Sequence, residues 1–223
     1  MGCGDGRHLL ALGPRGVSGV GLDSGEARLV SANEQAAAEK LDIRFIVGDA
    51  RDAALDEEFD SVLCLYDVVG SYSENQENAR ILNTVAKQLK KGGTALISVM
   101  NLELTKALSP AEFSAHREPD KLLELPASRI METSGNVFDP RHLLLDPETN
   151  VVYRREQFAA GGALPAEILV RDRRFSRDEI ESMCRAAGLE VVWSRFVQAG
   201  RWEAELGATG PGAKEILLLC IKS

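Results

Sequence analysis

The first hundred residues alternate short apolar segments with amphipathic ones, and this rhythm constrains the fold more than any other feature. Apolar segments of strand length occupy residues 17–23, 43–49, 59–65 and 94–100, and a stretch rich in alanine, glutamate and leucine lies at 26–40. That composition favours a helix. Strands that alternate with helices predict a parallel sheet with right-handed crossovers. The expected fold class is therefore α/β, with a doubly wound sheet.

Residues typical of helix starts and ends mark two further helices in the chain. Residues 73–76 have the form of a capping box, and Gly92 follows two lysines where the helix is expected to end. Near the C-terminus, Ser176 is expected to cap a helix that stops at Gly188. Further strands are expected at residues 190–197 and 215–221.

Residues 102–174 break the rhythm. Ser109, followed by a proline, predicts the start of a short helix. Apolar segments at 142–145 and 151–154 flank a turn-forming segment and predict a hairpin, to which 167–173 is expected to add a third strand. We expect this region to be an inserted antiparallel sheet that covers the ligand-binding end of the main sheet.

Composition excludes several classes of protein. The chain has 223 residues, of which 44% are hydrophobic, and a net charge of −8 with a pI near 5.1. An acidic chain is a poor match for nucleic acid or an anionic membrane. Its four cysteines form no C-x-x-C pair, so we expect reduced thiols in a cytoplasmic protein and no metal site.

Acidic residues end two of the predicted strands, at the sheet edge where a glycine-rich N-terminal loop is also expected. The loop reads G-x-G-x-G rather than the G-x-G-x-x-G of dinucleotide enzymes. Asp23 ends the next strand, where a carboxylate suits two ribose hydroxyls, and Asp49 is placed to accept from an adenine amino group. The spacing indicates an adenosine-type site. A simple glycine turn and helix caps at the two acids are the alternatives.

The segments GCGDG, GLD, VGDA, FDSVLCLYDVVGS and LKKGGTALISV resemble those of the class I S-adenosylmethionine-dependent methyltransferases. RRFSRDEIESMCRAAGLEVV and KEILLLCIKS resemble the late helix and the last strands of that superfamily. The resemblance implies a Rossmann-like methyltransferase sheet, mostly parallel with an antiparallel last strand. It assigns residues 1–101 and 175–223 to the cofactor-binding domain and residues 102–174 to a substrate-covering cap.

The resemblance also implies a set of cofactor contacts. The glycine loop would lie under the methionine moiety, Asp23 would hold the ribose, Asp49 with Ala50 would hold the adenine, and the end of the third strand would lie beside the methyl group. The implied cofactor-binding residues are Gly2, Cys3, Gly4, Asp5, Gly6, Asp23, Ser24, Asp49, Ala50, Leu65 and Tyr66.

Candidates for orienting or deprotonating the methyl acceptor are fewer. Asp67 and Tyr72 follow the third strand, and His116 and His142 lie in the insertion, where an imidazole has a pKa suited to a general base. The alternative is that none of them has a catalytic role. Asp67 would then be an ordinary loop acid, Tyr72 a tyrosine at the rim of the site, and the two histidines surface residues.

The reaction implied is methyl transfer from S-adenosylmethionine to a nitrogen or oxygen of a small molecule, with S-adenosylhomocysteine as product. Direct transfer needs alignment and exclusion of water rather than a nucleophile of the protein. The alternatives are a non-catalytic or regulatory methyltransferase-fold protein and, less favoured, an NAD-type oxidoreductase. The inserted sheet also allows a homodimer.

No strand precedes the glycine loop, although the loop should follow one. A central strand that is absent leaves backbone groups of both neighbours without partners. We therefore expect either that the natural product begins upstream of Met1 or that another segment or subunit fills the place of the strand.

Overall fold

The computed structural model describes residues 1–108, 143–158 and 166–223. The N-terminal part contains α1 (Arg7–Leu12), a 3-10 turn (Gly13–Arg15), β1 (Gly19–Asp23), α2 (Glu26–Ala38) and β2 (Ile43–Val47). It continues with β3 (Phe59–Cys64), α3 (Asn75–Gln88), β4 (Leu89–Met100) and α4 (Leu102–Leu108). The remaining elements are β5 (Leu143–Leu145), β6 (Val151–Phe158), β7 (Ala166–Arg173), α8 (Arg177–Ala186), β8 (Leu189–Gln198), β9 (Arg201–Leu206) and β10 (Glu215–Lys222).

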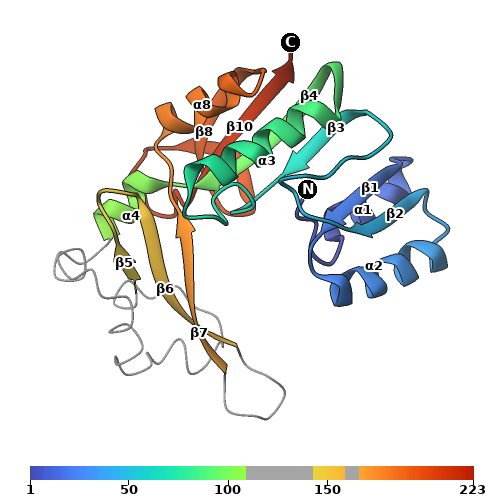
Figure 1. The fold of residues 1–223 in the computed structure, drawn as a ribbon, viewed down its shortest axis with the longest axis horizontal. Coiled ribbons are helices and arrows are strands. Elements are labelled where there is room, and N and C mark those ends of the chain that lie inside the picture. The colour runs from blue at the N-terminus through green and yellow to red at the C-terminus, as the bar shows by residue number, and fades with distance from the viewer. Residues whose placement is uncertain (109–142, 159–165) are drawn as a thin grey trace.

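The main sheet is mixed and has the strand order β3-β4-β10-β8-β9 (Figure 1). β3 and β4 are parallel, whereas β10 runs antiparallel to both β4 and β8. β1 and β2 form a separate parallel pair. The expected α/β class, with a parallel start and an antiparallel last strand, is confirmed.

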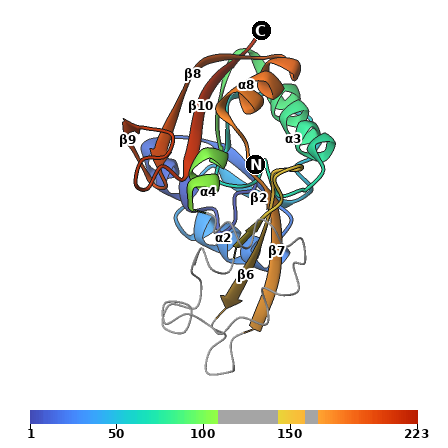
Figure 2. The ribbon, with the colours of Figure 1, turned by 90° about the vertical axis from the view of Figure 1, so that its left-hand side faces the viewer.

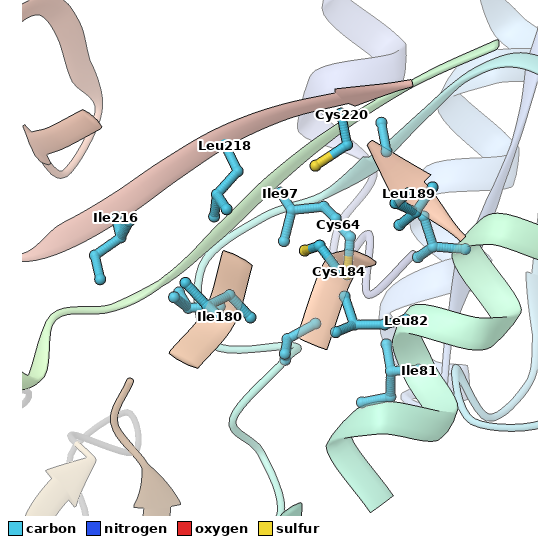
Figure 3. Close-up of a cluster of buried hydrophobic side chains, with 14 of the residues drawn as sticks. Cys64, Ile81, Leu82, Ile97, Ile180, Cys184, Leu189, Ile216, Leu218 and Cys220 are labelled. Atoms are coloured by element: carbon cyan, nitrogen blue, oxygen red, sulfur yellow. The ribbon is translucent and has the colours of Figure 1, made fainter. Parts of the chain in front are cut away.

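Helices α3 and α8 cover one face of the five-stranded sheet (Figure 2). Their apolar residues meet those of β3, β4 and β10 in the largest core cluster, part of which Figure 3 shows. Cys64, Cys184 and Cys220 meet here as buried free thiols. A smaller cluster joins α1 and α2 to β2 through Leu10, Leu29, Ala32, Ala36 and Phe45. These contacts fix the strand ends on which the candidate site is built.

Strands β5, β6 and β7 form an antiparallel sheet that extends away from the main sheet (Figure 1). The predicted hairpin and third strand are confirmed. This small sheet is tied to the large one where Arg173 N donates to Gly70 O at 2.8 Å and Phe175 N donates to Met100 O at 3.1 Å. The helix predicted at Ser109 lies outside the described residues, and the division into two domains stays a prediction.

Three local expectations are wrong. Helix α3 takes Glu74 as its N-cap with no side-chain cap bond, so the capping box at 73–76 does not form. β4 begins at Leu89 rather than 94, because Leu89 already pairs with Phe59 of β3, and an irregularity in the register separates this pair from the next, Thr94 with Ser61. β9 was not expected; its exposed, polar-rich pattern gives little strand signal. The cap at Ser176 is confirmed, since its hydroxyl accepts from Glu179 N.

β1 and β3 lie side by side without pairing (Figure 1). Among the described residues, only the N-terminal ones link the two strands, and they do so at one end. The Met1 ammonium donates to Leu63 O at 2.9 Å, and Cys3 N donates to Leu22 O at 3.0 Å. Residues 1–3 therefore occupy one end of the position that a central strand would take. The facing edges of β1 and β3 are otherwise unpaired along that gap.

Among the described residues, the helices are too short or too polar to cross a lipid bilayer.

Candidate functional site

A cavity of about 1280 Å³ lies at the carboxyl ends of β1, β2 and β3 and runs into the gap between β1 and β3. Its lining falls into four groups: the N-terminal loop, the acid that ends β1, the residues after β2 and the segment after β3. The lining residues used below are Gly2, Gly4, Gly6, Asp23, Ser24, Asp49, Ala50, Leu65, Tyr66, Asp67 and Tyr72. Parallel strands bring these sites together, since ligands bind at the carboxyl edge of such sheets.

The three loop glycines have backbone conformations that other residues rarely adopt. Gly2, Gly4 and Gly6 have φ values of 61°, 55° and 74°. A Cβ on Gly6 would lie 2.4 Å from Cζ of Phe45, whereas a Cβ on Gly4 would meet no atom within 4 Å. Gly6 thus lets the loop pack on the small core, and Gly4 leaves open space above the backbone.

Asp23 ties the loop to the end of β1. Its carboxylate accepts from Gly4 N at 2.7 Å and from Gly25 N at 2.9 Å, and Arg28 lies at 3.2 Å. The residue is 8% exposed and lines the cavity. An ionised carboxylate offers about four acceptor positions, and these three bonds leave about one for a ribose hydroxyl. Ser24, beside it, is exposed on the cavity wall.

Asp49 is held by a residue that the sequence reasoning missed. The guanidinium of Arg51 bonds both carboxylate oxygens, and Arg51 N donates to Asp49 Oδ1 at 2.8 Å. This bonding holds the pKa of Asp49 below its usual value. Arg51 also reaches Glu77 on α3 at 2.6 Å and lies over the ring of Tyr72 at 4.3 Å. The position of Arg51, two residues after a strand-ending acid, was the available signal.

Tyr66 follows β3 in a left-handed conformation, with φ of 67°. Its backbone N–H donates to Ser98 Oγ at 2.7 Å, and Arg7 lies over its ring at 5.4 Å. Strained non-glycine residues of this kind cluster at functional sites. Leu65 precedes it as a buried member of a cluster with Val197 and Leu217. Ser98 was missed, although a serine inside an apolar strand is a signal.

The candidate acceptor groups are only partly brought together. Asp67 and Tyr72 both line the cavity, and Asp67 pairs with Arg154 of β6 at 3.6 Å. The small sheet therefore reaches this end of the main sheet. His116 and His142 lie outside the described residues. Cys3 and Asp5 line the cavity with the loop, and burial raises the pKa of the Cys3 thiol to about 11.

Comparison with known proteins agrees with this architecture. Residues 1–93 match the family described as "Methyltransferase domain". Comparison with curated protein sequences gives no match. Among solved structures, the CcbJ methyltransferase of Streptomyces caelestis superposes with a TM-score of 0.73 at 18% identity, covering 100% of this chain and 86% of that one.

Two further structures are similar. An S-adenosylmethionine-dependent methyltransferase from Clostridium acetobutylicum has a TM-score of 0.70 at 14% identity, covering 99% of this chain and 81% of that one. An amino pentose methyltransferase from Micromonospora echinaspora, solved with S-adenosylmethionine bound, has a TM-score of 0.56 at 20% identity, with coverages of 100% and 81%.

Residues 1–93 thus match a methyltransferase domain, and the chain as a whole shares the fold of solved methyltransferases. The methyltransferase fold expected from the sequence motifs is thereby confirmed.

Proposed function

We propose that this protein transfers the methyl group of S-adenosylmethionine to a nitrogen or oxygen of a small molecule. The observation that carries the proposal is the shared cavity: the glycine loop, the acids after β1 and β2, and the segment after β3 all line it. The solved amino pentose methyltransferase named above acts on a small molecule and supports this choice of substrate class.

The residues present fit the cofactor. Gly4 leaves open space where a side chain would intrude, and Asp23 keeps about one acceptor position free beside the loop. We assign Gly2, Cys3, Gly4, Asp5 and Gly6 to the methionine moiety, Asp23 with Ser24 to the ribose, and Asp49 with Ala50 to the adenine. When bound, S-adenosylmethionine supplies a methyl group already activated by its positive sulfur.

Asp49 has a more specific role than a bare acceptor. Arg51 neutralises part of its charge and stacks on Tyr72. Tyr72 and Arg51 thus hold the loop after β2 against the segment after β3, which favours a defined adenine pocket.

The segment after β3 aligns the acceptor. Ser98 fixes the left-handed backbone at Tyr66, and this places Leu65, Tyr66 and Asp67 on the cavity wall. The ion pair with Arg154 restrains Asp67. Asp67 can therefore orient the methyl acceptor by accepting a hydrogen bond from its N–H or O–H group. Alignment and exclusion of water are what direct methyl transfer requires of a protein.

The test uses S-adenosylmethionine with a tritiated methyl group and a pooled set of small amines and alcohols. We expect label to move to molecules that pass an ultrafilter, and to fall at least tenfold with Asp23→Asn, since charge-assisted hydrogen bonds contribute roughly 1.5–3 kcal/mol. Asp56→Asn, which changes an exposed acid that does not itself line the cavity, is the matched control. Transfer of label only to macromolecules would contradict a small-molecule acceptor.

A further inference from the structure

At the end nearest the glycine loop, the gap between β1 and β3 is about one strand wide. The Met1 ammonium donates to Leu63 O at 2.9 Å on the β3 side, and Cys3 N donates to Leu22 O at 3.0 Å on the β1 side. Paired strands lie about 4.7–4.9 Å apart, so one short stretch of chain reaches both strands only if they are two such spacings apart. β1 and β3 are therefore spaced to receive a single extended chain.

The two facing edges carry backbone groups that point into the gap. The carbonyls of Leu22 and Leu63 do so, since they accept from the N-terminal residues. Backbone groups of alternate residues along a strand point to the same side, which directs Val20 of β1 and Ser61 of β3 into the gap as well. Within the described part of the chain, no further backbone bond reaches these edges. Unpaired edges of this kind are templates for another strand.

The walls of the gap are apolar on both sides. The cavity runs along β1 and β3, and residues that belong to or pack against both core clusters line it. Those of the larger cluster include Phe59, Val62 and Ile81, and those of the smaller one include Leu9, Leu41 and Ile43. A strand in this position lies between two cores, so its side chains must be apolar on both faces, as in buried parallel strands.

The far end of the gap, where β2 and β3 begin, is acidic. Its charged lining residues are four acids and two cations, namely Asp42, Glu57, Glu58, Asp60, Arg44 and Lys90. Arg44 pairs with Glu57, Lys90 pairs with Asp60 at 2.9 Å, and Lys222 lies 3.5 Å from Glu58. The acids outnumber the cations even when Lys222 is included. This end of the gap therefore suits a basic residue at the start of an occupying strand.

We propose that the gap between β1 and β3 is a docking site for one extended peptide strand, apolar on both faces and basic at its start. The strand runs parallel to β1 and β3 and ends beside Met1, which already holds the last position. It has about five residues, the length of β1. Docking joins the β1–β2 pair and the five-stranded sheet into one continuous sheet. The docking itself is independent of the proposed methyl transfer.

A docked strand also acts on the proposed cofactor site. The N-terminal residues are bonded to β1 through Asp23 and Leu22 and to β3 through Leu63. A strand paired with both edges holds the two walls of the cavity at a fixed spacing, and a cofactor that contacts both walls favours the same spacing. Strand and cofactor therefore bind with positive coupling, and each raises the affinity of the other by the same factor.

A synthetic peptide of two lysines followed by five alternating valines and leucines tests the docking. Its matched control has proline at the third apolar position, which keeps the peptide apolar but removes an N–H and prevents pairing inside a sheet. Calorimetry with the full-length protein should show one peptide bound per chain. At about 100 times its Kd, the peptide should raise the Tm by about 5–10 °C, whereas the proline peptide should leave the Tm unchanged.

A second measurement removes the dependence on the solubility and affinity of the free peptide. The same seven residues, joined to the nitrogen of Met1 by a peptide bond, present the strand at a high effective concentration. We expect this fusion to raise the Tm by at least the same amount, and the matched proline fusion to give no rise. The fused strand should also tighten the binding of S-adenosylhomocysteine about fivefold or more.

The outcomes separate docking from the cofactor claim. Equal Tm shifts from the valine–leucine and proline versions would reduce the site to unspecific apolar binding and overturn the proposal. No shift from either the free or the fused strand overturns it as well. So does a dimer, detected by light scattering, that excludes the peptide, because a second copy then fills the gap. A strand that docks while S-adenosylhomocysteine fails to bind would leave the docking site intact and contradict the proposed function.

Discussion

At the scale of single residues, the glycine loop depends on conformations that only glycine adopts readily. Gly6 combines a φ of 74° with a backbone packed against Phe45. Gly16 has a similar φ of 83°, but a Cβ there would meet no atom within 4 Å. A substitution at Gly16 therefore measures backbone strain alone, whereas one at Gly6 measures backbone strain together with a steric clash.

We predict that Gly6→Ala lowers the free energy of unfolding more than Gly16→Ala does. Both changes carry the cost of a left-handed alanine, about 1–2 kcal/mol, and Gly6→Ala adds the displacement of Phe45 from the small core. Urea unfolding followed by circular dichroism measures both. Equal losses for the two variants would show that the loop yields around an added methyl group.

At the scale of elements, Arg51 joins the loop after β2 to α3 through Asp49 and Glu77. Its hydrogen bonds lower the pKa of both carboxyl groups. A carboxyl group whose pKa is lower in the folded state stabilises the fold above its unfolded pKa, near 4, and loses that contribution as pH falls through the folded value. The link is therefore expected to matter at neutral pH and to fade in acid.

Replacing Arg51 by Met, which keeps the apolar stem, should lower the Tm at pH 7. The difference from the unmodified protein should start to shrink as pH falls below about 4, the pKa of the unfolded acids, and should continue to shrink until both acids are protonated in the folded protein at lower pH. Lys87→Met, which removes an exposed cation from the same helix, is the control. A Tm difference that persists unchanged at pH 3 would show that Arg51 acts through packing alone.

The strands and the site residues also show how much of the structure could be predicted from the sequence. The alternation of segments predicted the strands that line the site, because buried parallel strands are continuous apolar runs. The pattern did not predict β9 or the start of β4, because their residues are largely polar and pair only in the tertiary structure. The acids after β1 and β2 were predictable from their positions at strand ends. Arg51 and Ser98 carried only weak signals, since the bond from Arg51 to Glu77 depends on where α3 packs and the bond from Tyr66 to Ser98 depends on the pairing of β3 with β4.

At the scale of the whole molecule, the β1–β2 pair and the five-stranded sheet both line one cavity, and within the described residues their strands do not pair with each other. Met1 and Cys3 bridge β3 and β1 at the end nearest the glycine loop. The edges of β1 and β3 otherwise face each other across the gap, and residues of both strands line the cavity. The proposed cofactor site thus takes its lining from both the β1–β2 pair and the five-stranded sheet. We therefore expect cofactor binding to depend on the two being held together.

The central claim is that this cavity holds S-adenosylmethionine through the glycine loop and Asp23. Isothermal titration calorimetry with S-adenosylhomocysteine tests it most directly. We predict binding of one molecule per chain, weakened about tenfold to a hundredfold by Asp23→Asn and unaffected by Asp56→Asn. Absence of binding by a folded protein, or equal affinity in the Asp23→Asn variant, would contradict it.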